Sequence, residues 1–546
     1  MGIEKRARSH PENPGGDRMA PEAETSNFPQ MSRKSRTFAE VYGGTPNKEN
    51  RRLTKSFRKK AGSGRELVRP RNARVVGPGV SAMLRILTIL AAAVALVPTC
   101  FAATLTVDRV DDTASATNCN PSVAIDCSLR GAIIAANLTP GADVILMPSG
   151  TFTLTIQGTD NTAAAGDLDI TDHLNIIGAG RNRTVIDAGG STGLDDRVFH
   201  IDPSAAGLVV EIRDLTIRGG DTANGGGGIN VNCALNLQRV TLSGNHANGG
   251  GGIYAQYGSD VTVEDCLLDG NNVDNLGGAI FCDTIMTITR TTIGNNTAVN
   301  GAGLYVQGAS DALVQDSLIT GNTASGSGGG VYVESSFGSG IDIERSTITD
   351  NQALFGAALY TENGVVSLRN STVSGNVSTA GMFGTVIQSA ELNQVLEFTN
   401  CTCADNDNGG SGTDFLASGA GIHFTNTIVE GSCAGDFSTG GGNIECPSDN
   451  CGMTDATDQT GVSTSMLGLA PLGGTPPVHR LQAASIAIDA GINRSCPATD
   501  QRGMDRLVDG DSNGWATCDV GAIELQTLFR NGFEDGTTNA WSLTVQ

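Results

Sequence analysis

A single short pattern is repeated nine times along the middle of this 546-residue chain. In most copies an apolar residue is followed by Gly or Asp, then by Asn, and then by a cluster of glycines. The apolar position recurs every 25 to 30 residues and is occupied by Ile217, Leu242, Leu268, Ile293, Ile319, Ile348, Val373, Cys403 and Val429. A repeat of this length predicts a solenoid, in which each copy forms one turn and stacks on the next.

Each repeat contains the pattern of three short strands. Apolar residues lie five and seven places before the apolar position, as in Leu237 and Leu235, and this alternation is typical of a strand. A polar residue three places before it marks a bend, and a third strand follows the glycines, as in Gly252-Ile253-Tyr254. Strands rich in Val, Ile and Thr, with glycine in the connectors, exclude helical repeats. We therefore predict an all-β, right-handed parallel β-helix with turns about 4.8 Å apart.

Two polar columns of the repeat have expected structural roles. The asparagine column is Asn245, Asn271, Asn296, Asn322, Asn351, Asn376 and Asn406. We expect it to stack as a hydrogen-bonded ladder, in turns whose left-handed backbone Asn tolerates; the alternative is a set of independent turn residues. The bend column alternates in charge over Asp214, Arg239, Asp265, Arg290, Asp316 and Arg345. We expect a ladder that fixes register, because a slip of one turn would place like charges together; the alternative is chance alternation.

Composition divides the chain near residue 102. Residues 1–82 hold 18 Lys and Arg against 8 Asp and Glu and lack hydrophobic periodicity, which predicts a disordered basic extension. Residues 83–102 begin with Met83-Leu84-Arg85 and continue with an apolar run to Val97, the pattern of a secretory signal peptide that is too short for a membrane-spanning helix. Either Met83 is the true start of the protein, or a basic cytoplasmic tail precedes a signal anchor.

The chain after Ala102 is strongly acidic. It holds 16 Arg, no Lys and 49 Asp and Glu, a net charge of −33. Such a field repels nucleic acid and anionic lipid, so we expect neither as a partner, and we expect no transmembrane span in the mature chain. The field also opposes polyanionic substrates unless a divalent cation intervenes.

Twelve cysteines follow the signal sequence, an even number that predicts disulfides in an exported chain. The candidate pairs by proximity in sequence are Cys119 with Cys127, Cys496 with Cys518, Cys266 with Cys282, and one bridge among Cys433, Cys446 and Cys451. Zinc is the alternative, but no C-x-x-C pair occurs and the histidines are scattered.

The segments on either side of the repeats resemble known modules. Leu105-Thr106-Val107-Asp108, Cys127-Ser128-Leu129-Arg130-Gly131-Ala132, Gly150-Thr151-Phe152-Thr153-Leu154 and Gly166-Asp167-Leu168-Asp169-Ile170 look like the CSLREA domain, with Gly131 where that domain has Glu. Ala487-Ile488-Asp489-Ala490-Gly491, Asp500-Gln501-Arg502-Gly503 and Cys518-Asp519-Val520-Gly521-Ala522-Ile523-Glu524 resemble the choice-of-anchor Q region. The turn pattern is also similar to polymorphic outer-membrane protein repeats, without their aromatic position. The resemblance implies an exported bacterial protein of the pectin-lyase-like superfamily and informs fold and location more than activity.

An open parallel coil exposes strand edges and an apolar interior at both ends, so both ends need covers. We expect a short amphipathic helix over Ser128–Asn137 to cover the first turn and the disulfide-tied C-terminal segment to cover the last. The expected parts are a basic extension (1–82), a signal peptide (83–102), an N-terminal cap (103–165), the β-helix (166–465), a C-terminal cap (466–526) and a tail (527–546).

The sequence offers little sign of catalysis. G-H-G and R-I-K elements of polygalacturonase-type hydrolases are absent, as are G-x-S-x-G and H-E-x-x-H. A lyase needs a base beside a neutralised carboxylate, for which Arg239, Arg290 and Glu264 are the candidates. Their recurrence in the repeat favours a scaffold role instead. Aromatic residues make up only 4% of the chain, which argues against a platform for stacking sugars.

One segment resembles a calcium loop. Asp509-Gly510-Asp511-Ser512-Asn513-Gly514 places oxygen ligands at positions 1, 3 and 5 and glycine at position 6. Position 12 is Val520, so the usual acid is missing, but Asp519 adjoins it. The candidate calcium ligands are therefore Asp509, Asp511, Asn513 and Asp519, and the alternative is an Asp/Gly turn. We predict no other cofactor.

Taken together, these features predict an exported, disulfide-stabilised binding and structural protein, similar to an adhesin, outside a bacterium or on its surface. Its long polar faces suit weak multivalent contacts with cell-surface glycans or proteins. The alternative is a polysaccharide lyase or glycoside hydrolase.

Overall fold

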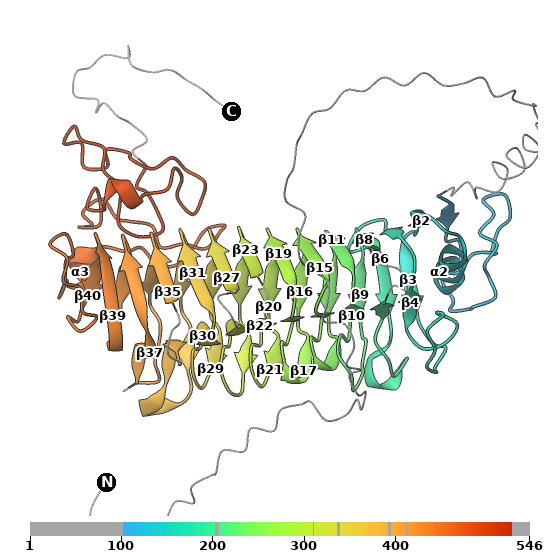
Figure 1. Ribbon diagram of the computed structural model, residues 1–546. Helices are drawn as coiled ribbons and strands as arrows, with labels where there is room; N and C mark the ends of the chain where they lie inside the picture. The colour runs from blue at the N-terminus through green and yellow to red at the C-terminus, as the bar shows by residue number, and fades with distance from the viewer. Residues whose placement is uncertain are drawn as a thin grey trace, which may run out of the picture. The chain divides into compact units, whose positions relative to one another are not determined.

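The computed structural model describes residues 102–526, except 203–206, 309–310, 336–338, 391–394 and 411. The expected basic extension, nearly all of the expected signal peptide and the expected tail from residue 527 lie outside the described residues. The described chain forms an all-β parallel β-helix, as predicted (Figure 1). In this part of the chain, no helix has the length and apolar character needed to cross a membrane.

The largest sheet joins two rows of strands, and all its pairings are parallel. The row before the bend is β1 (Thr104–Thr106), β2 (Asp143–Leu146), β5 (Leu174–Ile177), β8 (Val209–Arg213), β11 (Ala234–Gln238), β15 (Asp260–Glu264), β19 (Ile285–Thr289), β23 (Asp311–Gln315), β27 (Gly340–Glu344), β31 (Val365–Arg369) and β35 (Val395–Thr399). The row after the glycines is β4 (Leu168–Ile170), β7 (Phe199–Ile201), β10 (Ile229–Val231), β14 (Ile253–Ala255), β18 (Ile280–Cys282), β22 (Leu304–Gly308), β26 (Val331–Ser335), β30 (Leu359–Asn363) and β34 (Thr385–Ser389). The long strands β37 (Thr413–Thr425) and β39 (Cys433–Gly441) pass through both rows.

Two further sheets complete each turn. The twelve-stranded sheet follows the bend and consists of β3 (Gly150–Thr153), β6 (Thr184–Asp187), β9 (Thr216–Arg218), β12 (Thr241–Ser243), β16 (Leu267–Asp269), β20 (Thr292–Gly294), β24 (Leu318–Thr320), β28 (Thr347–Thr349), β32 (Thr372–Ser374), β36 (Thr402–Ala404), β38 (Ile428–Glu430) and β40 (Ile444–Cys446). The six-stranded sheet is β13 (His246–Gly249), β17 (Asn272–Leu276), β21 (Thr297–Ala298), β25 (Thr323–Ala324), β29 (Gln352–Ala353) and β33 (Val377–Ser378). The helices are α2 (Leu129–Leu138) and α3 (Thr464–Leu467), with 3-10 turns η1 (Gly190–Thr192), η2 (Gly381–Phe383) and η3 (Asn493–Ser495).

The repeated apolar position lines the interior of the coil. Leu242 pairs in register with Leu268, Leu268 with Ile293, and the same column continues to Val429. These side chains are fully buried. Full burial of one Leu or Ile side chain contributes roughly 1.5–3 kcal/mol, so every added turn extends one continuous core.

The asparagine column forms a continuous hydrogen-bond ladder that is buried from Asn245 to Asn376 and half-buried at Asn406. Asn271 Nδ2 donates to Asn296 Oδ1 at 3.0 Å, and Asn296 Nδ2 donates to Asn322 Oδ1 at 2.8 Å. The same side-chain bond, between 2.8 and 3.0 Å, joins every consecutive pair from Asn245 to Asn406. Each Oδ1 also accepts the backbone N–H of the preceding member, and Nδ2 also donates to a backbone carbonyl, as in Asn296 to Leu268. The ladder therefore satisfies polar groups that the turn would otherwise bury unpaired.

The left-handed backbone lies elsewhere than we expected. The ladder asparagines are not left-handed; the residue before each one is, for example Gly244 (φ 59°) and Asn295 (φ 55°). All nine bend residues from Asp214 to Asn426 are also left-handed, with φ between 46° and 59°. At each bend a single residue adopts the left-handed backbone conformation, which costs an L-residue about 1–2 kcal/mol. The side-chain contacts of the bend column therefore have a local strain to offset.

We predict that Asn296→Ala lowers the free energy of unfolding by about 3 kcal/mol, because it leaves several buried donors and acceptors of Asn271, Asn322 and Leu268 unpaired. Denaturant unfolding followed by circular dichroism measures this. Asn248→Ala is the control, since the side chain of Asn248 is exposed on β13 and is not part of the ladder. Equal losses for the two variants would show that the ladder contributes nothing.

The charged bend residues form three separate pairs rather than one continuous ladder. Arg239 binds Asp214 through two hydrogen bonds of 2.6 and 2.8 Å, and Arg345 binds Asp316 at 2.7 and 2.8 Å. Arg290 binds Asp265 at 2.8 and 3.2 Å and also contacts Glu264. Each Arg reaches back one turn and binds the Asp there through two hydrogen bonds, and among the described residues no bend Arg pairs with the Asp of the following turn. Hydrogen bonding to Arg239 holds the pKa of Asp214 below its usual value.

We predict that Arg290→Glu lowers the unfolding midpoint more than Arg183→Glu, because it places three carboxylates together at one bend. Arg183 is an exposed arginine of the coil with no ion pair among the described residues. Thermal unfolding at low and high salt distinguishes the two, since salt should reduce the difference. Equal midpoints would remove the idea that the pairs set register.

Five aromatic rings stack along the outer side of the strands that follow the glycines. Tyr254, Phe281, Tyr305, Tyr332 and Tyr360 occupy one register position on consecutive turns, with ring centroids 4.5 to 5.5 Å apart. The three central rings are buried, so the stack is a second, outer core rather than an open surface for sugars. The hydroxyls of the two central tyrosines are hydrogen-bonded: Tyr332 Oη donates to Glu362 at 2.7 Å, and Tyr305 Oη donates to Glu334.

The N-terminal segment covers the first turn, and the residues of its motif have separate tasks. Ser128 caps α2 by accepting the N–H of Gly131. Arg130 is buried, pairs with Asp112, and donates to the carbonyls of Ala163 and Gly166. A Cβ on Gly131 would lie 2.0 Å from a backbone oxygen of Ala116, which explains why a larger residue is absent there.

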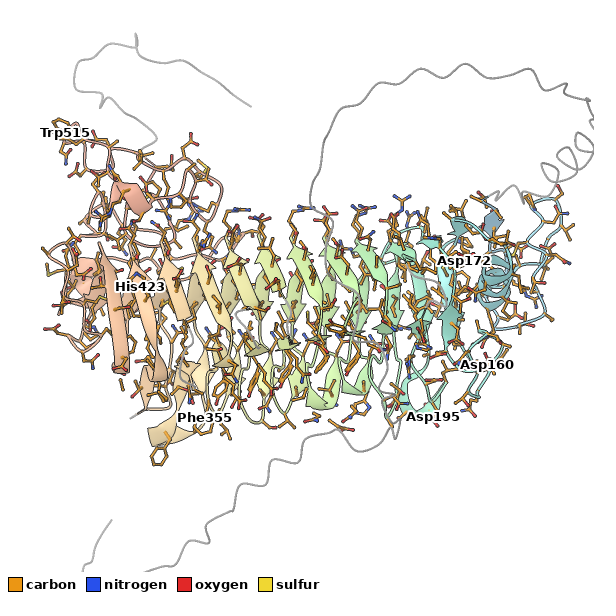
Figure 2. All side chains as sticks on the ribbon, viewed as in Figure 1. Asp160, Asp172, Asp195, Phe355, His423 and Trp515 are labelled. Atoms are coloured by element: carbon orange, nitrogen blue, oxygen red, sulfur yellow. A yellow bond between two sulfur atoms is a disulfide. The ribbon has the colours of Figure 1, made fainter. Side chains whose placement is uncertain are left out.

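The C-terminal segment (residues 468–526) lies mainly along the side of the coil. Gln501 bonds Thr372 and the carbonyl of Ser346, and Asn426 exchanges hydrogen bonds with Ile492. The last turns are covered partly by this segment, through Leu481 and Val520, and partly by residues before it, through Val462 and Leu467. Figure 1 shows this segment in red beside the last turns, and Trp515 protrudes from it (Figure 2).

Three disulfides are present among the described residues: Cys119–Cys127, Cys433–Cys451 and Cys496–Cys518. The predictions for the first and third pairs are confirmed, and Cys446 is the unpaired member of the middle group. The predicted Cys266–Cys282 bridge is wrong. Cys266 lies at a bend and donates to Glu264 O, whereas Cys282 lies in β18 and donates to Thr284 O. Both stay buried free thiols, and burial raises their pKa values to about 11 and 12.

Candidate functional site

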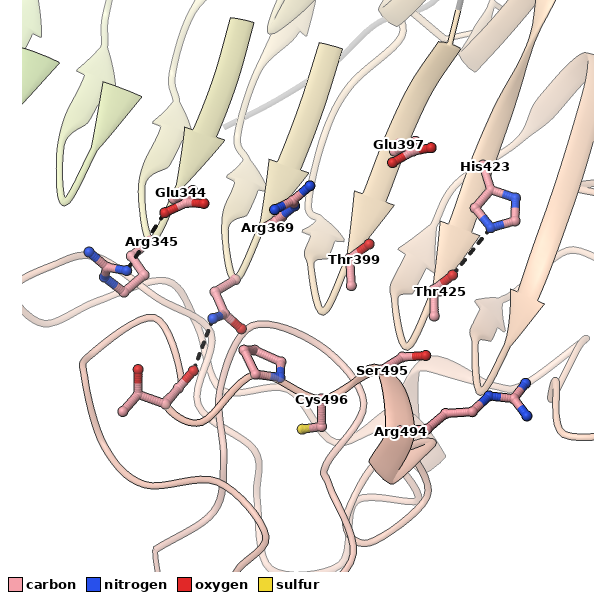
Figure 3. Close-up of a pocket in the computed structure, with 13 residues that line it drawn as sticks. Glu344, Arg345, Arg369, Glu397, Thr399, His423, Thr425, Arg494, Ser495 and Cys496 are labelled. Atoms are coloured by element: carbon pink, nitrogen blue, oxygen red, sulfur yellow. Dashed lines mark hydrogen bonds and ion pairs between the residues drawn. The ribbon is translucent and has the colours of Figure 1, made fainter. Parts of the chain in front are cut away.

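A groove lies between the outer face of the coil and the C-terminal segment. Its floor is formed by the ends of β27, β31, β35 and β37, and its wall by residues 494–499 (Figure 3). The cavity has a volume of about 590 Å³, within the range of small-ligand sites. The lining residues are Glu344, Arg345, Arg369, Asn370, Glu397, Thr399, His423, Thr425, Arg494, Ser495, Cys496, Pro497 and Thr499.

The floor of the groove interrupts the repeat. Glu397 and His423 are register neighbours on consecutive turns. The same column holds Asn175, Glu211, Asn236, Thr262, Thr287, Leu313, Asp342 and Ser367 on the preceding turns. Carboxylates therefore occur elsewhere in the column, at Glu211 and Asp342, and the change at this place is the imidazole of His423 next to the carboxylate of Glu397. Figure 3 shows both side chains on the floor, with Arg494 on the opposite wall.

Several charged groups of the groove have no ion pair with any described residue. Arg345 pairs with Asp316, and Glu344 accepts a hydrogen bond from Gln315. Arg369, Glu397 and Arg494, in contrast, have no opposite charge within 4.0 Å in the described part of the chain. His423 is oriented by Ser438, whose Oγ lies 2.9 Å from Nδ1. The groove thus presents one carboxylate, two guanidinium groups and an imidazole that are not neutralised by each other.

The bend column changes character where the wall is attached. In the three turns after Arg345 the bend residues are Asn370, Asn400 and Asn426 instead of charged residues, and all three are buried. Asn370 Nδ2 donates to Thr499 O at 2.9 Å, and Asn426 Oδ1 accepts the N–H of Ile492 at 2.7 Å. Neutral amides can donate to and accept from the backbone of the docked segment, whereas buried unpaired charges would destabilise the contact.

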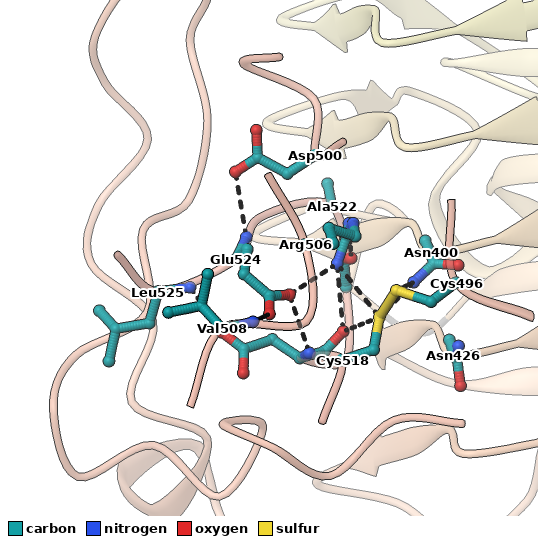
Figure 4. Close-up of polar contacts among 12 residues, drawn as sticks. Asn400, Asn426, Cys496, Asp500, Arg506, Val508, Cys518, Ala522, Glu524 and Leu525 are labelled. Atoms are coloured by element: carbon teal, nitrogen blue, oxygen red, sulfur yellow. Dashed lines mark hydrogen bonds and ion pairs between the residues drawn. A yellow bond between two sulfur atoms is a disulfide. The ribbon is translucent and has the colours of Figure 1, made fainter. Parts of the chain in front are cut away.

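A buried arginine holds the docked segment together (Figure 4). Arg506 donates to Asn370 Oδ1 at 3.0 Å and to Gly521 O at 2.7 Å, and pairs with Glu524 at 3.4 Å. Both charged side chains are fully buried. Burial raises the pKa of Glu524 above its ordinary value.

The catalytic candidates from the sequence lie outside this groove. Arg239 and Arg290 are engaged at bends with Asp214 and Asp265, and Glu264 contacts Arg290 and Gln238. None of these three residues lines the cavity. Their recurrence from turn to turn is explained by the pairing at the bends.

The predicted calcium ligands are only partly brought together. Asp509 and Asp511 lie in one cluster with Asp489, each offering an oxygen within 4.8 Å of the others. Asn513 instead donates to Asp511, and Asp519 is buried, where its oxygens accept the N–H groups of Asp489 and Leu525. Burial raises the pKa of Asp519 to about 7, so this carboxylate is poorly suited to stay charged beside an ion. Burial, followed by the nearby charge of Asp511, also raises the pKa of Asp489.

The calcium hypothesis therefore concerns Asp489, Asp509 and Asp511. If the hypothesis holds, millimolar calcium raises the melting temperature measured by calorimetry, EDTA lowers it, and Asp511→Asn removes the difference. Asp436→Asn is the control, as an acidic residue remote from this loop. A melting temperature that ignores calcium and EDTA would leave the loop as an Asp/Gly turn.

The comparisons with known proteins give one family match and several solved structures. The sequence profile described as a right handed beta helix region matches residues 197–326 and 278–451. A pectate lyase structure is 16% identical, with a TM-score of 0.38, over 78% of this chain and 98% of that one. The A-module of a mannuronan C-5 epimerase from Azotobacter vinelandii is 14% identical, with a TM-score of 0.30, over 61% and 95%. The catalytic domain of a GH87 alpha-1,3-glucanase in complex with nigerose is 13% identical, with a TM-score of 0.30, over 62% and 64%.

No curated protein matches the sequence. The family match agrees with the β-helix fold of the described residues, and no activity follows from the fold.

Sequence reasoning missed the groove residues Arg369, Glu397, His423 and Arg494, as well as Asp489. A signal for His423 was present, since the preceding members of its column hold no other histidine, whereas Glu397 follows the carboxylates Glu211 and Asp342 in that column. Arg494 and Asp489 had no comparable signal, because the sequence does not show where the C-terminal segment docks.

Proposed function

We propose that this protein is an exported binding module that holds an extended glycan in the groove beside the C-terminal segment. The observation that carries the proposal is the meeting of Glu397 and His423 on the groove floor with Arg494 on its wall. Glu397 and Arg494 make no ion pair with any described residue, so their polar atoms are available to a ligand in the groove. Recognition of a ligand explains their placement.

The chemistry of the groove suits a hydroxyl-rich ligand. Carboxylate, guanidinium, imidazole and threonine side chains can donate to and accept from sugar hydroxyls. The lining has no Phe, Tyr or Trp, so stacking contributes little and each contact is weak. A polymer that extends along the coil beyond the groove could gain affinity through several weak contacts.

Export is supported by the signal-like pattern of residues 83–102 and by the three disulfides, which persist in oxidising compartments. We propose a location outside a bacterial cell or on its surface, as the sequence resemblance also implies.

A second candidate, a polysaccharide lyase or glycoside hydrolase, is favoured by one observation. The groove brings a carboxylate, an imidazole and an arginine to one cavity, and these are groups that serve as acid, base and charge stabiliser. Release assays on neutral and uronic-acid polysaccharides, with Glu397→Gln and His423→Asn as variants, test this. Turnover by the wild type that either variant abolishes would favour the enzyme.

The binding proposal predicts that Thr399→Trp, which fills the groove floor, abolishes glycan binding on an array and by calorimetry. Thr289→Trp is the matched control, because Thr289 occupies the same register column on a turn outside the groove and is equally half-buried. Both variants should unfold at similar temperatures. Binding that survives Thr399→Trp would contradict the groove as the site.

A further inference from the structure

The groove concentrates positive charge on an otherwise acidic protein. Arg345, Arg369 and Arg494 line it together with two glutamates, Glu344 and Glu397. Beyond Ala102 the chain carries only 16 arginines against 49 acidic residues, so three arginines at one cavity are a local reversal of its charge. Two of them, Arg369 and Arg494, have no ion pair with a described residue, in contrast to the arginines of the bends.

We propose that the groove selects an anionic glycan, one that carries carboxylate or sulfate groups, and that Arg369 and Arg494 are its anion-binding residues. This proposal rests on the proposed function, since it assigns the ligand class of the same groove. It also revises the expectation from net charge alone, which opposed polyanionic ligands without a divalent cation.

The placement of the two arginines supports this assignment. Arg369 is exposed at the end of β31, and Arg494 is exposed on η3 in the wall, so an anionic chain in the groove meets one guanidinium from each side. A guanidinium binds carboxylate or sulfate oxygens through two parallel hydrogen bonds, which neutral hydroxyls do not match in strength.

The acidic groups that face the arginines restrict where an anionic ligand can bind but do not prevent its binding. Glu344 Oε2 lies 3.9 Å from Arg345 Nη1, so Glu344 offsets part of the positive charge of Arg345. Glu397 remains on the floor beside His423. An anionic group is therefore favoured next to Arg369 and Arg494 and disfavoured next to Glu397. A glycan in which acidic and neutral units alternate, or whose acid groups are spaced apart, fits this pattern of charge.

Opposite long-range and short-range fields give the proposal a distinctive kinetic signature. The whole protein repels an anion at distances beyond the groove, whereas the arginines attract it at contact. Salt screens distant charges more than contacting ones, with a screening length of about 10 Å at 0.1 M. We therefore expect the association rate for an anionic glycan to rise between 10 and 150 mM NaCl, opposite to the usual electrostatic steering, which salt weakens.

The experiment measures the binding of four probes to the chain after Ala102 by surface plasmon resonance. The probes are an oligogalacturonate, the same oligosaccharide with its carboxyl groups reduced, a dextran sulfate oligomer, and the matching neutral dextran. We expect the acidic probes to bind at least tenfold more tightly than their neutral partners, and whichever acidic probe binds more tightly identifies carboxylate or sulfate as the preferred group.

The variants Arg369→Gln and Arg494→Gln should each weaken the acidic probes about tenfold and leave the neutral probes nearly unchanged. Arg183→Gln, at an exposed arginine remote from the groove, is the control. Circular dichroism and the melting temperature confirm that the variants are folded.

The outcomes separate the two proposals. Equal affinity for acidic and neutral probes, abolished by Thr399→Trp, would overturn the anionic assignment and leave the groove as a glycan site. Tight binding of acidic probes that both Arg variants retain would also overturn the assignment. Binding of no probe, or binding that Thr399→Trp does not affect, would overturn the proposed function and the assignment with it.

Discussion

The hydrogen bond from one asparagine to its equivalent on the next turn is the interaction on which the rest of this structure depends. It repeats without interruption from Asn245 to Asn406, inside the protein, at nearly constant length. Because the amide both donates and accepts, a turn that slipped along its neighbour would leave buried polar groups unpaired. The apolar core provides most of the stabilising burial, but a core of Leu, Ile and Val does not by itself define one register.

The bends use the register that the ladder sets in two different ways. In the earlier turns they hold Asp–Arg pairs at the surface, and in the three turns after Arg345 they hold buried asparagines that receive the C-terminal segment. The groove is a consequence of that change. It forms where a regular surface meets an irregular segment, and the mismatch leaves a cavity lined from both sides.

Much of the fold could be predicted from sequence because its signals are periodic. The interior column from Ile217 to Val429, the asparagine ladder positions and the capping helix begun by Ser128 all follow from spacing and residue type. The left-handed positions were misplaced by one residue, since spacing alone does not show whether Asn295 or Asn296 has the left-handed backbone conformation. The aromatic stack was not predicted, although Tyr254, Tyr305, Tyr332 and Tyr360 each stand two residues after the glycine cluster or its equivalent.

The candidate site was much less predictable, for a physical reason. Arg369 and Arg494 are 125 residues apart in sequence, and only the docking of the C-terminal segment brings them to one cavity. That docking depends on hydrogen bonds to backbone atoms of residues such as Ile492 and Thr499, which any residue type can supply. Cys266 and Cys282 failed as a pair for a related reason, because closeness along the chain says nothing about the direction in which each side chain points.

The unequal lengths of the turns lead to a last consequence. From Leu235 to Asn245, from Ile341 to Asn351 and from Leu396 to Asn406 the spacing is always ten residues, although the turns themselves differ by up to five. All growth therefore occurs at the two corners beside the strands that follow the glycines, such as the corner between β34 and β35. Insertions there can enlarge or diversify one flank of the molecule while the opposite flank, where the C-terminal segment is seated, keeps a constant geometry. The coil thus separates a side on which the turns differ in length from a docking side on which their spacing is constant.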